Sequence, residues 1–328
     1  MFDLCLDKAA EWILSKGFTS VAIQVPEGLR MTASDIADQL SSRTNVNVTI
    51  TGDPCYGACD VPVNYKDIAE GLIHFGHSPI PSVTNDDDIL FIEAFAAADI
   101  RSGISKIADR LPERIGLLAS VQYVNMLKDA KDVLEGLRKI VFIGKGDARM
   151  RYDGQILGCN CSAAESVKDD ADCFLYIGEG DFHPLAAALC TDKEVMAFDP
   201  VTNELRSMND VRDRIIRKRF AAIESAKNAF TFLVIVSSKA GQRRDAAADG
   251  IIKKITSAGK KAYKVVMNEI TPDSLLSYKV DVYVNTACPR LATDDSLRYG
   301  RPILTIPEAE IAIGVREWDD NEFDQIRG

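Results

Sequence analysis

Cysteines recur at the same place in three parts of the sequence pattern. The pair Cys55 and Cys59, the pair Cys159 and Cys161, and the single Cys288 each follow a short β-type run and lie among turn-forming residues. Open α/β sheets bind ligands at the carboxyl ends of their strands, so these thiols are expected to face a cleft. Three thiolates from three loops could hold an iron–sulfur cluster and leave one iron open for a substrate. This spacing therefore favours cluster chemistry.

Two of these places hold a pair of cysteines. Cys55 lies four residues from Cys59 and Cys161 lies two residues from Cys159, so one member of each pair is an exchangeable ligand or a bystander. Cys5, Cys173 and Cys190 lie within apolar patterns and are expected to fill the core. A structural zinc site needs a second closely spaced cysteine pair, and the sequence has none. A cluster is therefore favoured over zinc.

Several polar residues near strand ends are candidates for binding a polar ligand. The stretch that ends at Gln242 follows a strand and combines small residues with Lys239, which suits an anionic group. A helix N-cap at Ser237 or Ser238 explains the same residues equally well. His183 is either a satisfied loop histidine or a substrate contact. The motifs of P-loop proteins and serine hydrolases are missing from the sequence.

The elements that must position these residues alternate between strands and helices, as in parallel α/β proteins. The expected helices cover about 5–16, 30–41, 124–138 and 207–229. The expected strands cover 20–25, 46–50, 72–75, 89–92, 115–118, 140–143, 155–157, 174–177, 195–198, 232–236, 263–266, 280–284 and 303–306.

These elements form three blocks, predicted as domains 1–100, 101–206 and 207–328. Each block has a β run that ends in small residues, then His or Cys, then Pro: HFGHSP, IGEGDFHP and VNTACP. Shared turn chemistry would explain this echo, but a true triplication is favoured. We therefore predict three similar parallel-sheet α/β domains around a central cleft, with one loop cysteine from each.

Composition narrows the range of functions. The chain has 328 residues, of which 46% are hydrophobic and 27% are charged, and this is an ordinary globular composition. Its formal net charge is −10, which is a poor match for a protein that binds nucleic acid. No apolar run approaches the roughly 20 residues of a membrane span, and the start lacks a signal-peptide pattern, so we expect a cytoplasmic protein. The basic stretch 212–219 is interpreted as a solvated helix face, with a docking surface as the alternative.

The motifs together resemble those of the archaeal diphthamide synthase family. The resemblance lies in DPCYGACD at 53–60, ILGC at 156–159, GEGDFHP at 178–184, SSKAGQ at 237–242 and ACPRL at 287–291. It implies a homodimer of three-domain subunits and a 4Fe-4S cluster held by Cys59, Cys159 and Cys288. It also implies an S-adenosylmethionine pocket, for which Gln242, His183, Arg290 and Gly178 are candidates.

The activity implied by the resemblance is the first step of diphthamide biosynthesis. A reduced cluster cleaves S-adenosylmethionine to a 3-amino-3-carboxypropyl radical, which adds to a histidine of translation elongation factor 2. An external electron donor is then required, and the sequence nominates no catalytic residue beyond the cluster. Two alternatives stay open: a quinolinate-synthase-like 4Fe-4S dehydratase, and a non-catalytic cluster-binding scaffold.

Overall fold

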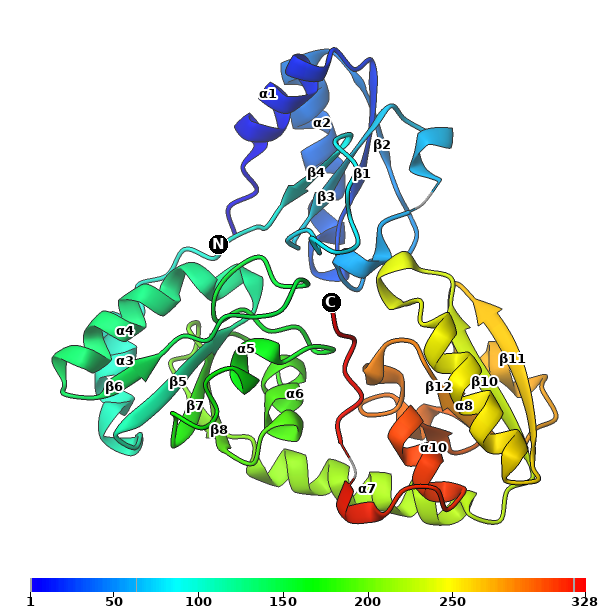
Figure 1. Cartoon of the computed structure of the whole chain (residues 1–328). Coiled ribbons are helices and arrows are strands. Elements are labelled where there is room, and N and C mark those ends of the chain that lie inside the picture. The colour runs from blue at the N-terminus through cyan, green and yellow to red at the C-terminus, as the bar shows by residue number, and fades with distance from the viewer. Residues whose placement is uncertain (1, 63, 321) are drawn as a thin grey trace.

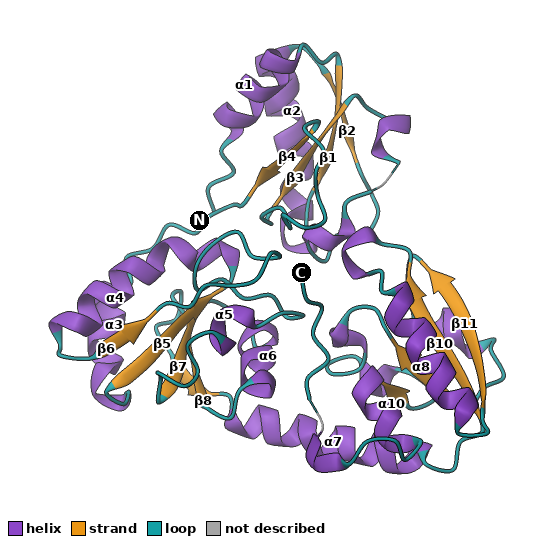
Figure 2. Cartoon of the chain, viewed as in Figure 1, coloured by secondary structure: helices purple, strands orange, loops and turns teal. Residues whose placement is uncertain are grey.

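Three units surround a common centre in the computed structural model, which describes residues 2–62, 64–320 and 322–328. Each unit contains one sheet, and the carboxyl terminus of the chain lies between the three units (Figure 1). Helices flank the sheets, and loops from all three units meet in the centre (Figure 2). The arrangement confirms the predicted class of three similar α/β domains.

The first unit has a fully parallel sheet in the order β2-β1-β3-β4. Its strands are β1 (Ser20–Gln24), β2 (Asn47–Ile50), β3 (Gly71–Phe75) and β4 (Ile89–Ile92). The helices α1 (Leu6–Lys16) and α2 (Ala33–Thr44) bury an apolar stripe against this sheet. Strand β3 is buried along its whole length, as expected for a central parallel strand.

The second unit repeats this order as β6-β5-β7-β8 and adds β9 as an antiparallel edge strand. Its strands are β5 (Arg114–Ala119), β6 (Ile140–Phe142), β7 (Cys173–Ile177), β8 (Glu194–Phe198) and β9 (Leu205–Ser207). Its helices are α3 (Arg101–Ile107), α4 (Leu127–Gly136), α5 (Ser162–Glu165) and α6 (Phe182–Cys190).

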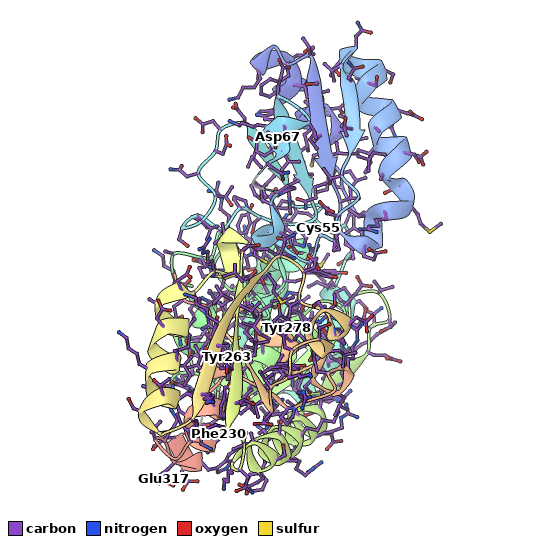
Figure 3. All side chains as sticks on the ribbon, turned by 90° about the vertical axis from the view of Figure 1, so that its right-hand side faces the viewer. Cys55, Asp67, Phe230, Tyr263, Tyr278 and Glu317 are labelled. Carbon is purple, nitrogen blue, oxygen red and sulfur yellow. The ribbon has the colours of Figure 1, made fainter. Side chains whose placement is uncertain are left out.

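The third unit has the order β11-β10-β12-β13, again parallel. Its strands are β10 (Thr231–Ser237), β11 (Lys261–Met267), β12 (Val282–Asn285) and β13 (Ile303–Leu304). Its helices are α7 (Asn209–Ala226), α8 (Asp245–Ser257), α9 (Pro272–Leu276) and α10 (Ile306–Ala312). Strand β11 is an exposed edge, and Tyr263 on it faces the viewer in Figure 3.

The same strand order in all three units supports the predicted triplication. In each unit the second strand pairs with the first, the first with the third and the third with the fourth. Loops from each of the three units reach the shared centre (Figure 1). The domain boundaries after residues 100 and 206 stay a prediction, although each sheet lies within one of the predicted ranges.

One predicted strand is absent from the structure, and the last one is shorter than predicted. Residues 155–157 form no strand, because Leu157 and Asn160 exchange two backbone hydrogen bonds and turn the chain after one bridge to Ala119. The last strand stops at Leu304 rather than at 306. There the Thr305 side chain caps α10 and Glu308 returns a hydrogen bond to the Thr305 backbone, so the next residue is already helical.

Helix α7 carries the basic stretch 212–219, and only part of that stretch is surface. Arg219 is 6% exposed and forms an ion pair of 2.5 Å with Glu308. It therefore joins α7 to α10 and is unavailable to an external partner. Among the described residues, no helix has both the length and the apolar character that crossing a bilayer requires.

Candidate active site

A cavity of about 270 Å³ lies where the three units meet, and it is lined by the three loop cysteines. Cys59 belongs to the loop after β2, Cys159 to the loop after β6, and Cys288 to the loop after β12. Each strand belongs to a different sheet, so the cavity needs all three units. The structure therefore brings together the three thiols that were grouped from the sequence.

The loop of Cys59 is held by the third unit. The Gln242 side-chain amide donates a hydrogen bond of 3.2 Å to the Cys59 sulfur. Gly241 lies against the Cys59 backbone so closely that a Cβ on it would stand 2.6 Å from the Cys59 Cβ. The Lys239 ammonium lies 2.5 Å from the buried Asp60 carboxylate. The loop after β10 thus fixes this thiol from a distant part of the chain.

Cys159 is held from two sides. Arg149, only 4% exposed, donates from Nη2 to the carbonyl of Gly241 over 3.0 Å and lies next to the Cys159 thiol. Its Nε has no hydrogen-bond partner among the described residues. On the other side, the backbone N–H of Ile326 donates to the Cys159 carbonyl over 2.8 Å. The carboxyl-terminal segment therefore supports the second cysteine loop.

Cys288 is positioned by a fully buried amide in its own unit. Asn285, at the end of β12, donates to the Cys288 carbonyl over 2.9 Å and accepts from the backbone N–H of Ala287 over 3.0 Å. One side chain thus closes the turn that follows the strand, which is a common use of asparagine. This turn places the thiol at the cavity wall.

Burial raises the pKa of all three thiols above the ordinary value. For Cys59 burial and the Asp60 carboxylate raise the pKa to about 12. For Cys288 burial is the first cause, and the neighbouring thiols raise its pKa further. Burial also raises the pKa of Cys159, but Arg149 opposes this shift. These groups are therefore protonated thiols near neutral pH unless a metal displaces their protons.

The two neighbouring cysteines do not line this cavity. Cys55 is buried, and its sulfur lies 4.0 Å from Nε2 of His74. It lies at the base of the first unit, next to the other two (Figure 3). Cys161 is fully buried in the core of the second unit, and it contacts Cys190. Both surroundings favour bystanders over ligands. As expected, Cys173 is buried in the core too.

A chain of hydrogen bonds fixes the protonation of two histidines beside Cys55. The Gln24 amide donates to the Asp60 carbonyl over 2.9 Å, so its oxygen must accept from Nδ1 of His74, 2.7 Å away. Nε2 of His74 then accepts from Nδ1 of His77 over 2.9 Å. The ligand atoms of Cys55, His74 and His77 lie within 4.8 Å, but the contacts between them are hydrogen bonds. Nε2 is therefore the unprotonated ring nitrogen of His77, a residue that lines the cavity.

Three of the four residues predicted to bind S-adenosylmethionine line the central cavity, and the fourth does not. Gln242, His183 and Arg290 line the cavity, and the Arg290 guanidinium lies 5.2 Å from the centre of the Phe182 ring. His183 belongs to the first turn of α6 rather than to a loop. Gly178 is outside this lining and packs against the hydroxyl of Tyr176.

Comparison with known proteins identifies the family of this chain. The family described as "Putative diphthamide synthesis protein" matches residues 25–323. The chain belongs to this family. A "2-(3-amino-3-carboxypropyl)histidine synthase" of Pyrococcus horikoshii is 38% identical over 318 residues, which cover 95% of this chain and 90% of that protein. Subunit 1 of the corresponding human synthase is 29% identical over 91% of this chain and 70% of its own length.

The fold agrees with a solved member of the diphthamide synthesis family. The crystal structure of Dph2 from Pyrococcus horikoshii with a 4Fe-4S cluster superposes with a TM-score of 0.92 at 36% identity. The match covers all of this chain and 95% of the other. The three-unit arrangement is therefore shared with that structure.

The sequence did not point to Arg149 or His77 as members of this family's central cavity. Arg149 ends the fragment GKGDAR, which was interpreted as an ordinary turn, and nothing local says that it reaches Gly241 of another unit. His77 had a weak signal, since it stands where His183 stands in the second block. Aligning the three repeats would have singled it out.

Proposed function

We propose that this chain is a 2-(3-amino-3-carboxypropyl)histidine synthase. It transfers the 3-amino-3-carboxypropyl group of S-adenosylmethionine to a histidine of translation elongation factor 2, the first step of diphthamide biosynthesis. The observation that carries this proposal is one cavity lined by three thiols from three units, in a chain of the diphthamide synthesis family. The names of the relatives favour this transferase over a dehydratase or a scaffold.

The cavity suits a 4Fe-4S cluster held by Cys59, Cys159 and Cys288. Three thiolates around such a cluster give an anionic group, and two guanidinium groups, those of Arg149 and Arg290, line the same cavity. The Nε of Arg149 is buried without a partner among the described residues, which fits a donor meant for a bound group. When bound, the cluster supplies one electron and an open iron for S-adenosylmethionine.

The chain's own residues would bind and orient S-adenosylmethionine. Arg290 offers a guanidinium to the methionine carboxylate, and His183 offers a ring at the wall of the same cavity. Gln242 and Gly178 are the other two candidates, and Gly178 has less support because Tyr176 covers it. Orientation matters here, because the bond that breaks is set by which carbon the pocket aligns for reaction.

Two further cavities adjoin the central one, which suits an enzyme with two substrates. A cavity of about 260 Å³ shares His77 and His183 with it, and another of about 210 Å³ shares Tyr56 and Arg290. One could admit S-adenosylmethionine, and the other could admit the histidine of the protein substrate. A second copy of the chain and an electron donor complete the proposed assembly.

Anaerobic reconstitution with iron and sulfide tests this proposal. The reconstituted protein, incubated with dithionite, S-adenosylmethionine and elongation factor 2, should release methylthioadenosine and add one aminocarboxypropyl group to the factor, measured by mass spectrometry. Serine at Cys59, Cys159 or Cys288 should abolish cluster binding. Cys161→Ser is the matched control, since this buried thiol does not line the cavity. A full cluster in all three ligand variants would contradict the assignment.

A further inference from the structure

Two of the three cavity thiols have a side-chain N–H donor beside them, and for Cys59 that donor comes from another unit. Gln242 of the third unit donates to the sulfur of Cys59 in the first unit over 3.2 Å. Arg149 lies beside Cys159 with a buried Nε that has no partner among the described residues. For Cys288 the donor next to the sulfur is a backbone N–H, that of Arg290. The side-chain donors are therefore distributed unequally.

The Gln242 donor is held in place by its own loop. Gln242 is 7% exposed, and its backbone N–H donates to the carbonyl of Lys239 over 3.0 Å. Lys239 is anchored by Asp60 and Glu269, at 2.5 and 2.6 Å. Gly241 packs directly against Cys59, so the loop cannot slide past the thiol. The amide is thus set against the sulfur without help from a ligand.

The Arg149 donor is fixed just as firmly. Its backbone N–H donates to the carboxylate of Asp147 over 2.9 Å, and its Nη2 donates to the carbonyl of Gly241 over 3.0 Å. The first bond holds the backbone of Arg149, and the second holds its guanidinium while leaving Nε without a partner among the described residues. A buried cation with an unused donor stabilises a nearby group that gains negative charge.

Hydrogen bonds to the sulfur ligands are among the features that set the reduction potential of iron–sulfur clusters. A donor or a positive charge near the thiolate favours the reduced form, because reduction adds negative charge. We propose that Gln242 and Arg149 raise the reduction potential of the cluster and so make it accessible to its electron donor. This inference rests on the proposed function. It assigns Gln242 a role as a hydrogen-bond donor to the sulfur of Cys59 instead of a role in binding S-adenosylmethionine.

A redox titration followed by electron paramagnetic resonance tests the inference on the reconstituted full-length protein. Gln242→Met keeps the length of the side chain and removes the donor. At a fixed solution potential, the ratio of reduced to oxidised cluster should fall about tenfold, which corresponds to about 59 mV for a one-electron couple. Arg149→Met should lower the ratio further, because it removes a charge as well as a donor.

Gln122→Met is the matched control. Gln122 lines the same cavity, but its amide donates to the carbonyl of Gly76 and not to a sulfur. Its redox titration should superpose on that of the wild type. If Gln242→Met binds no cluster, the comparison of Arg149→Lys with Arg149→Met carries the test, since lysine keeps the charge and a donor.

The experiment distinguishes failure of this inference from failure of the proposed function. Wild-type potentials in both Gln242→Met and Arg149→Met, at full iron content, would overturn the inference and leave the proposed function intact. A wild-type protein that binds no cluster under the same conditions would overturn the proposed function itself. Activity is not needed for either measurement, so the readout does not depend on substrate binding.

Discussion

The ammonium group of Lys239 lies 2.5 Å from the carboxylate of Asp60, and this ion pair joins the third unit to the first. The two side chains are only 10% and 1% exposed. Glu269 provides a second carboxylate for the same lysine, and these hydrogen bonds raise the pKa of Lys239 although burial opposes the shift. Asp60 is the residue after Cys59, so the ion pair supports the cysteine loop of the cavity as well as the stability of the fold.

Removing one partner of this pair should be strongly destabilising. Lys239→Met leaves the Asp60 carboxylate buried without its cation, and such losses cost about 3–5 kcal/mol. Urea denaturation followed by circular dichroism measures the change. Lys131→Met is the control, because Lys131 forms an exposed pair with Glu135 and should cost less than about 1 kcal/mol. Equal stability of the two variants would contradict the prediction.

Gly241 should not tolerate even a methyl group. In Gly241→Ala the new Cβ would stand 2.6 Å from Cβ and 2.7 Å from Cα of Cys59, and neither atom can rotate away. We expect a loss of about 1–3 kcal/mol and a lower iron content after reconstitution. In Gly250→Ala, on α8, the Cβ meets no atom within 4 Å, so this variant should gain up to about 1 kcal/mol.

The carboxyl-terminal segment should be needed to hold the loop of Cys159. Asp324 forms two hydrogen bonds of 2.7 Å with Arg244, and Ile326 pairs with the backbone of Cys159. Deleting residues 324–328 should reduce cluster occupancy and expose the 158–161 loop to limited proteolysis.

Arg327→Ala is the control for that deletion, since its pair with Glu165 is half exposed and should matter by less than about 1 kcal/mol. Unchanged iron content in the deletion variant would show that the loop holds its shape alone.

Acid should destabilise the fold through its histidines. Burial lowers the pKa of His74 below the usual range, and it lowers the pKa of His77 and His183 to about 4. Between about pH 6.5 and about pH 4 the unfolded chain therefore binds protons that the folded chain does not, so stability falls as the pH falls. For His77 the loss at about pH 5 is about 2 kcal/mol relative to neutral pH.

His77→Asn isolates this contribution, because its side-chain amide can still donate to His74. Urea denaturation of both proteins at about pH 7.5 and about pH 5 should show a smaller loss in the variant. A pH dependence identical to that of the wild type would show that His77 does not contribute.

The arrangement of strands was predictable from the sequence because each unit is built from local patterns. Buried parallel strands are continuous apolar runs, and the runs in β3, β7 and β10 have no competing interpretation. The prediction of a strand at 155–157 was wrong, because a tight turn closed by hydrogen bonds between Leu157 and Asn160 outweighs the strand propensity of these residues. Local propensity cannot reveal such a turn.

The candidate site was predictable only in its thiols. The repeat revealed the three cysteine loops, and the motifs of the resembled family then singled out Cys59, Cys159 and Cys288 within them. Arg149 and Gln242 act across unit boundaries, and no local pattern encodes which unit a loop will reach. The contact between Gln242 and Cys59 spans most of the chain, and it depends on how whole units dock.

The three-unit cavity also has a consequence during protein synthesis. Cys59 leaves the ribosome before its donor Gln242 and before the last thiol, Cys288, and Ile326, which supports the second cysteine loop, follows later still. A partly made chain therefore presents isolated thiols and no pocket. The cavity can therefore form only after all three units have been synthesised and have docked.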